Sequence, residues 1–172
     1  MQDKNKVEEY IRLGTEGTFR FTANLHEQSI DLEKNTVEVE LIEEGSWRHP
    51  AAPNGVFVAT KERISTWVKN FKDGIMGNML PLDFAHSPDS KETPGWIVDL
   101  YEVNNNNLVE FKDKFKGKAF DLVKQKVQDG KSHLFATLRI TEPTVLERIK
   151  NGSLCFISGE IQSAWEDPKN GQ

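Results

Sequence analysis

The chain has 172 residues, enough for one domain with a hydrophobic core, and its 37% hydrophobic and 28% charged residues are typical of a folded chain. Its net charge of -5 provides no basic surface for nucleic acid or a membrane, and no apolar run reaches the roughly 18 residues of a membrane span. The single cysteine, Cys155, excludes an intrachain disulfide and favours a reducing compartment, so we expect a cytoplasmic protein.

The first third of the chain predicts two strands after a charged start. Residues 1–14 mix charges with few apolar positions, so we expect a flexible N-terminal segment followed by a single domain over residues 15–172. Apolar and polar residues alternate in two segments, residues 18–25 and residues 36–41. In the second of these, Glu38 and Glu40 fall on the face opposite the valines, so we expect that face to meet water.

A loop, a short strand and a helix are expected next. Residues 45–55 contain two prolines and are predicted as a loop, with Trp47 filling a gap in the core. Residues 56–59 predict a short strand, and residues 60–74 predict the clearest helix of the chain. Its apolar residues recur at helical spacing, Thr60 can accept a hydrogen bond from the first turn, and a glycine ends it.

The second half of the chain continues with strands and two further helices. Strands are predicted over residues 79–86, 95–103, 133–141 and 154–163. Helices are predicted over residues 112–131, which are rich in lysine, and over residues 143–150, which begin with proline. The order of elements predicts a mainly β (α+β) fold, a small antiparallel β-barrel decorated by short helices.

Two side chains are candidates for nucleophilic catalysis. Ser158 lies in the last predicted strand, with Glu160 two residues further on and so on the same face of that strand. His86 ends a predicted strand at the start of a loop, where an imidazole can be both oriented and reachable. Taken alone, each is also typical of a structural residue.

The segments that carry these residues resemble a known family. They are Leu80-Pro-Leu-Asp-Phe-Ala-His86, then Pro94-Gly-Trp-Ile-Val-Asp-Leu100, and finally Ile149-Lys-Asn-Gly-Ser-Leu-Cys-Phe-Ile-Ser-Gly159. In this order they resemble the head-maturation (prohead) serine proteases of tailed bacteriophages, closest to the Mu-type group, and the resemblance covers about residues 36–163. The family is related to the herpesvirus assemblins, so the resemblance implies an assemblin-like barrel.

The resemblance also implies roles for individual residues. Ser158 matches the nucleophile and His86 the general base, because a serine hydroxyl is a weak nucleophile until an imidazole takes its proton. Glu160 is our candidate for the third catalytic member, with Asp83 a less favoured one and a residue beyond Gln172 a further possibility. The backbone N–H of Gly159 is a candidate for holding the oxyanion.

A serine endopeptidase of this kind would cleave the scaffold protein, the major capsid protein and itself, with self-association, inside the assembling prohead in the cytoplasm of an infected bacterium. We expect no cofactor and no metal, because Asp83 points away from His86 in a strand. The alternative is a non-catalytic capsid scaffold or binding module on the same barrel, using the lysines of residues 112–131. A metal-dependent hydrolase using Asp83, His86 and Asp89 is a third, more distant option.

Overall fold

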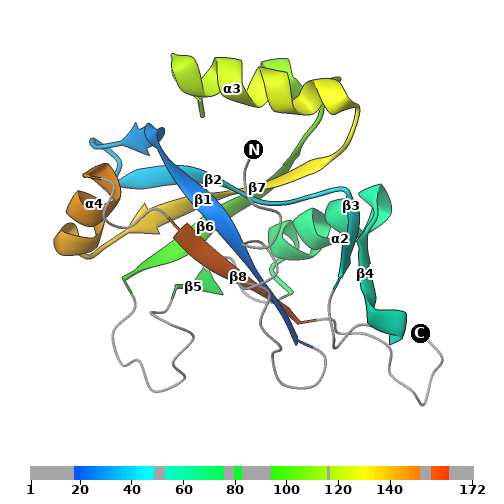
Figure 1. Ribbon diagram of the computed structural model, residues 1–172. Helices are drawn as coiled ribbons and strands as arrows, with labels where there is room; N and C mark the ends of the chain where they lie inside the picture. The colour runs from blue at the N-terminus through cyan, green and yellow to red at the C-terminus, as the bar shows by residue number, and fades with distance from the viewer. Residues whose placement is uncertain are drawn as a thin grey trace.

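The computed structural model contains a mixed α+β fold built around one antiparallel sheet (Figure 1). It describes residues 18–48, 53–75, 80–82, 94–115, 117–151 and 156–162. The sheet has six strands in the order β5-β6-β7-β2-β1-β8. These are β1 (Thr18–Asp31), β2 (Thr36–Glu43), β5 (Leu80–Pro81), β6 (Gly95–Val103), β7 (His133–Ile140) and β8 (Phe156–Gln162). The α+β class and the antiparallel pairing are therefore as predicted.

The sheet does not close into a barrel through its strand pairing. Among the described strands, β5 and β8 occupy the two edges of the strand order and each pairs with a single neighbour. The long β1 changes partner along its length: its first half pairs with β8 and its second half with β2, across an irregularity between Leu25 and Ile30. Strands that pass from one pairing to another in this way are the usual corners of strongly bent sheets.

One face of the sheet packs against two helices, α2 (Lys61–Lys72) and α4 (Pro143–Lys150). Alternate residues of the central strand β7 point to this face, from Leu134 to Ile140, and meet Ile64 of α2 and Val145 of α4. Leu138 is 1% exposed and Ile64 fully buried, which puts the centre of the larger hydrophobic core here. Both helices lie where the sequence predicts them.

The opposite face is covered only in part, by α3 (Lys118–Lys126), which lies across the sheet (Figure 1). Phe135 of β7 and Tyr101 of β6 pack here against Phe115 and Val123. The next residues of β7 on the same face are Thr137 and Arg139, which line a cavity instead of a core. The uncovered half of this face is thus polar.

The helix expected over residues 112–131 is shorter than predicted. A 3-10 turn, η2 (Leu108–Phe111), comes first, and α3 begins only after Gly117, which adopts a φ of 57°. That left-handed conformation interrupts a right-handed helix, and glycine adopts it without the steric cost that other residues incur. The last turn, η3 (Val127–Asp129), ends at Gly130, the stop that the sequence indicates.

Two other expectations are wrong. The predicted loop 45–55 contains a strand, β3 (Gly45–Arg48), which pairs with β4 (Val56–Ala59) as a separate hairpin. Trp47 lies on this strand and packs against the core as predicted. The face of β2 expected to meet water does not: Glu38 is 7% exposed, because the chain segment before α3 folds over it.

Within the described residues, no helix is both long and apolar enough to cross a membrane.

Candidate functional site

The predicted nucleophile lies on the edge strand β8. There Ser158 is the Cα partner of Thr22 on β1, and the neighbouring pairs are Gly159 with Phe21 and Glu160 with Arg20. The backbone of this strand is described, and its pairing confirms the strand predicted from the sequence. His86 and the less favoured Asp83 lie outside the described residues, as does Asp89.

The segment that leads toward His86 enters the sheet at the other edge. Strand β5 pairs with β6, with Leu80 opposite Ile97 and Pro81 opposite Trp96, and the N–H of Leu82 donates to the carbonyl oxygen of Gly95 at 2.9 Å. The Gly-Trp-Ile strand therefore lies directly beside the short strand β5.

The structure explains why residue 95 is a glycine. A β-carbon at this position would lie 2.2 Å from the carbonyl oxygen of Arg139 on the neighbouring β7. No real β-carbon tolerates such a distance, so only glycine permits β6 to approach β7 here. The glycine of the Gly-Trp-Ile motif thus serves strand packing.

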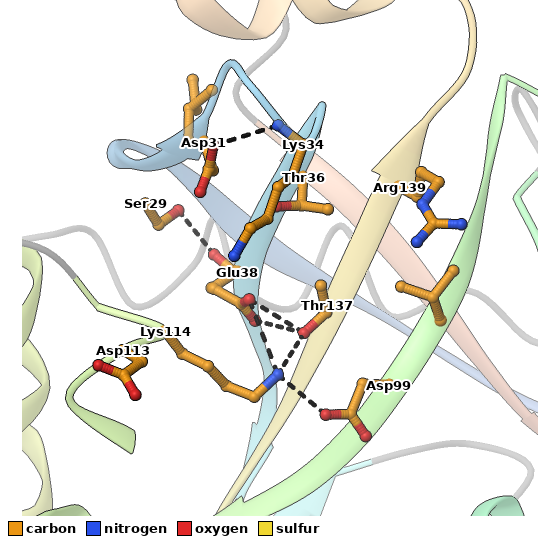
Figure 2. A pocket seen from close by; sticks show the side chains of 12 residues that line it. Ser29, Asp31, Lys34, Thr36, Glu38, Asp99, Asp113, Lys114, Thr137 and Arg139 are labelled. Atoms are coloured by element: carbon orange, nitrogen blue, oxygen red, sulfur yellow. Dashed lines mark hydrogen bonds and ion pairs between the residues drawn. The ribbon is translucent and has the colours of Figure 1, made fainter.

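A second group of polar side chains, which the sequence did not indicate, lies on the uncovered half of the sheet (Figure 2). The carboxylate of Glu38 accepts a hydrogen bond from the Tyr101 hydroxyl at 2.6 Å and from the Thr137 hydroxyl at 2.7 Å. The ammonium of Lys114 lies 3.0 Å from Oγ1 of Thr137 and 2.9 Å from Oδ2 of Asp99. We call these five residues the Glu38 network.

The Glu38 network borders an open cavity of about 310 Å³. Burial raises the pKa of Glu38, although the hydrogen bonds from Tyr101 and Thr137 and the charge of Lys114 act in the other direction. Burial and the nearby carboxylate also raise the pKa of Tyr101, so its hydroxyl remains a donor. A buried carboxylate that keeps its charge needs such donors, and here two hydroxyls provide them.

A third polar group surrounds His133, which begins β7 and is 1% exposed. Its Nδ1 lies 2.6 Å from Oε1 of Glu40, and its Nε2 lies 3.1 Å from Oδ1 of Asp129. Glu40 also forms an ion pair with Lys126 of α3. We call these four residues the His133 cluster; it ties the end of α3 to the sheet.

Both ring nitrogens of His133 face carboxylates, so the ring donates two hydrogen bonds as an imidazolium. Burial alone would lower its pKa, but the hydrogen bonds to Glu40 and Asp129 outweigh burial and raise it. Burial alone would raise the pKa of Glu40, but the hydrogen bond from His133 and the charge of Lys126 outweigh burial and lower it. The sequence predicted His133 only as a strand-end residue; its role depends on contacts that no local pattern reveals.

Three potential metal ligands meet in the same place: donor atoms of Glu40, Glu43 and His133 lie within 4.8 Å of one another. A metal ion at this place would need a free lone pair on Nδ1 of His133. In the structure that nitrogen bonds to Glu40, whose other oxygen is paired with Lys126. The observed arrangement is that of an internal ion cluster, and it fits a protonated histidine better than a metal.

Two side chains of the lysine-rich segment have partners within the chain. Lys126 pairs with Glu40, and Lys114 lies within the Glu38 network, so two of its lysines face the protein rather than a partner.

Comparison of the chain with known proteins finds no matching family model, no similar curated protein and no similar solved structure.

Proposed function

We propose that this chain is a capsid-assembly serine endopeptidase of the prohead type, which cleaves scaffold protein, capsid protein and itself during phage head maturation. The observation that carries the proposal is the pairing of β5 with β6, which sets the strand before His86 beside the Gly-Trp-Ile strand. The same sheet contains β8, with Ser158 in its middle. This spatial relation supports a resemblance that was drawn from motif order alone.

Catalysis requires the two edges of the sheet to meet. Ser158 belongs to edge strand β8, and the segment before His86 belongs to edge strand β5. The change of partner along β1 bends the sheet, and further curling into an assemblin-like barrel would bring these edges together. The barrel is therefore part of the proposal, since an open flat sheet would keep the two residues apart.

In the proposed mechanism, Oγ of Ser158 attacks the scissile carbonyl carbon while His86 takes the hydroxyl proton. The backbone N–H of Gly159 stabilises the oxyanion, and Glu160 orients the imidazole. The imidazolium then gives its proton to the leaving amine as the peptide bond breaks. Water, activated by the same histidine, hydrolyses the acyl-enzyme and restores Ser158.

Reactivity toward a fluorophosphonate probe tests the proposal directly. We expect the full chain at high concentration to gain one probe mass, and both Ser158→Ala and His86→Ala to gain none. Ser65→Ala is the matched control, because Ser65 is an exposed serine whose hydroxyl donates to Glu102, and labelling should persist in it. The same two catalytic variants should stop cleavage of the phage scaffold protein.

Labelling that survives in Ser158→Ala would refute the assignment of the nucleophile. A folded chain that neither reacts nor cleaves scaffold protein, even when concentrated with it, would favour the alternative, a non-catalytic scaffold or binding module.

Cross-linking of introduced cysteines, in a Cys155→Ser background, tests whether the edge strands β5 and β8 come together. Cysteines introduced at Ser158 and His86 should be joined by a short bifunctional thiol reagent, dibromobimane, because a serine–histidine hydrogen bond allows the two Cα atoms to lie beyond the roughly 7 Å that a direct disulfide needs. Cysteines at Ser158 and Lys118 provide the control pair, which should not be joined. Failure of the first pair to cross-link would refute the meeting of the two edges.

A further inference from the structure

The ammonium group of Lys114 lies in surroundings that are typical of a binding site for a cation. Its nitrogen lies 2.9 Å from a carboxylate oxygen of Asp99, 3.0 Å from the Thr137 hydroxyl and 4.0 Å from Oε1 of Glu38. It also lies 4.6 Å from the centre of the Tyr101 ring, over its face. Figure 2 shows the lysine side chain reaching Glu38, Asp99 and Thr137.

Three of the groups around the ammonium, Glu38, Thr137 and Tyr101, have contacts with one another and with aromatic rings that do not involve Lys114. Thr137 donates its only hydroxyl hydrogen to Glu38, so its oxygen lone pairs face Lys114. Tyr101 also donates to Glu38, and its ring is stacked against Phe111 and Phe135, which fixes the aromatic face. The oxygens of Glu38 and Thr137 and the ring face of Tyr101 would therefore remain in position if the Lys114 side chain left.

The charge of the cavity favours a cation once Lys114 is removed. Its lining contains four acidic side chains, Asp31, Glu38, Asp99 and Asp113, and three basic ones, Lys34, Lys114 and Arg139. Without Lys114 the acidic groups outnumber the basic ones by four to two. A desolvated ammonium gains from both nearby carboxylates and an aromatic face.

The cavity is open to solvent and lies away from the proposed catalytic strand. It borders Ser29 of β1, seven positions beyond Thr22, which is the partner of Ser158. At about 3.3 Å per residue this separation is about 23 Å of chain, which passes through the irregularity between Leu25 and Ile30.

Lys114 reaches this position from a short irregular segment between η2 and α3. Its side chain is 28% exposed, and its backbone N–H donates to the carbonyl oxygen of Phe111. The segment ends at Gly117, whose left-handed conformation allows a sharp change of direction. The lysine is thus a tethered ligand that can withdraw without unfolding a helix.

We propose that Glu38, Asp99, Thr137 and Tyr101 form a binding site for a primary ammonium group, which Lys114 fills from within the chain. A lysine side chain of a partner or a free alkylamine fills the same site by displacing Lys114. Occupation from outside would displace the Lys114 side chain into solvent, while Phe115 beside it stays packed against Tyr101 and Phe135. The site is independent of the proposed protease activity.

The test is chemical rescue of Lys114→Ala. This substitution removes three methylene groups and the ammonium, which together correspond to n-propylammonium. We expect the variant to unfold at a lower Tm than the native chain and n-propylammonium to raise its Tm. The expected rise is about 4 °C for each tenfold increase in amine above its dissociation constant. Tetramethylammonium and Na⁺ at equal ionic strength should have no such effect.

Two control variants identify the site. Lys69→Ala removes an exposed lysine that pairs with Asp73 on α2, and n-propylammonium should not restore its Tm. Lys114→Ala with Asp99→Asn retains the cavity but loses a carboxylate, and the rescue should disappear. A rescue that persists in the double variant would overturn the site.

A lysine tripeptide with blocked ends separates the two sources of the amine. If a lysine side chain can enter the site, the tripeptide should raise the Tm of Lys114→Ala. It should raise the Tm of the native chain less, because Lys114 competes for the site there. If only n-propylammonium raises the Tm, the site accepts small amines alone and the partner-lysine part of the proposal is refuted. Should Lys114→Ala be unfolded without amine, recovery of folded protein in n-propylammonium is the same measurement. A variant that does not respond to the amine in either form overturns the proposal.

Discussion

Gly95 on β6 lies so close to Arg139 on β7 that a β-carbon on the glycine would stand 2.2 Å from the arginine carbonyl oxygen. The atom in the way belongs to the backbone of a central strand, which cannot move aside as a flexible side chain can. This contact explains a glycine within the Gly-Trp-Ile motif by strand packing, before any appeal to function.

We therefore expect Gly95→Ala to lower the free energy of unfolding by about 3 kcal/mol, the upper range for overpacked interiors. Urea unfolding followed by circular dichroism measures the loss. Gly45→Ala is the matched control, since its β-carbon would meet only Nε1 of Trp47, at 3.9 Å. Equal effects of the two substitutions would show that the close contact with Arg139 is not limiting.

Substitutions of Glu38 test whether its carboxylate is a structural acceptor. Glu38→Ala leaves the Tyr101 hydroxyl and Lys114 without this partner, and we expect a loss of about 3–5 kcal/mol, as for other broken buried pairs. Glu38→Gln retains one acceptor oxygen for the two hydroxyls and should cost less than about 2 kcal/mol. Denaturant unfolding at neutral pH compares them. Indistinguishable losses would argue against the hydrogen bonds as the cause.

The His133 cluster makes stability depend on pH in a defined direction. The pKa of His133 in the folded chain lies above its ordinary value of 6.5, so its contribution is complete below pH 6.5 and is lost as pH rises through the folded value. The pKa of Glu40 lies below 4.5 and that of Asp129 below 3.8, so their contributions are complete above pH 4.5 and are lost in acid. Glu43, 3.9 Å from the ring, and Lys126 also face the cluster.

We expect this cluster to contribute most between pH 4.5 and 6.5. Above that window the native chain should lose about 1.4 kcal/mol for each unit by which the folded pKa of His133 exceeds its ordinary value. Denaturant unfolding at a series of pH values gives the slope, and His133→Gln should remove it. Asp129→Asn should only reduce it, because Asp129 is 33% exposed and Glu40 still bonds Nδ1. A slope that His133→Gln leaves unchanged would assign it to other groups.

Local patterns in the sequence predicted much of the secondary structure because the responsible forces are local. Residues Pro143–Lys150 form a helix as expected, since proline suits the first turn and apolar residues follow at helical spacing. Thr60 caps α2 by accepting the N–H of Arg63 at 3.1 Å, also as expected. The helix predicted over residues 112–131 begins later than expected, because apolar spacing does not reveal that Gly117 adopts a positive φ of 57°.

The sequence by itself determined the α+β class, the antiparallel strands and the placement of Ser158 in a strand, because periodicity and capping act between near neighbours. Only the tertiary structure decided that Glu38 is buried, since its partners Tyr101 and Thr137 lie 63 and 99 residues away. The same holds for His133 and Glu40, which are 93 residues apart. A charged residue is buried only where distant groups supply its hydrogen bonds, and the fold alone brings those groups together.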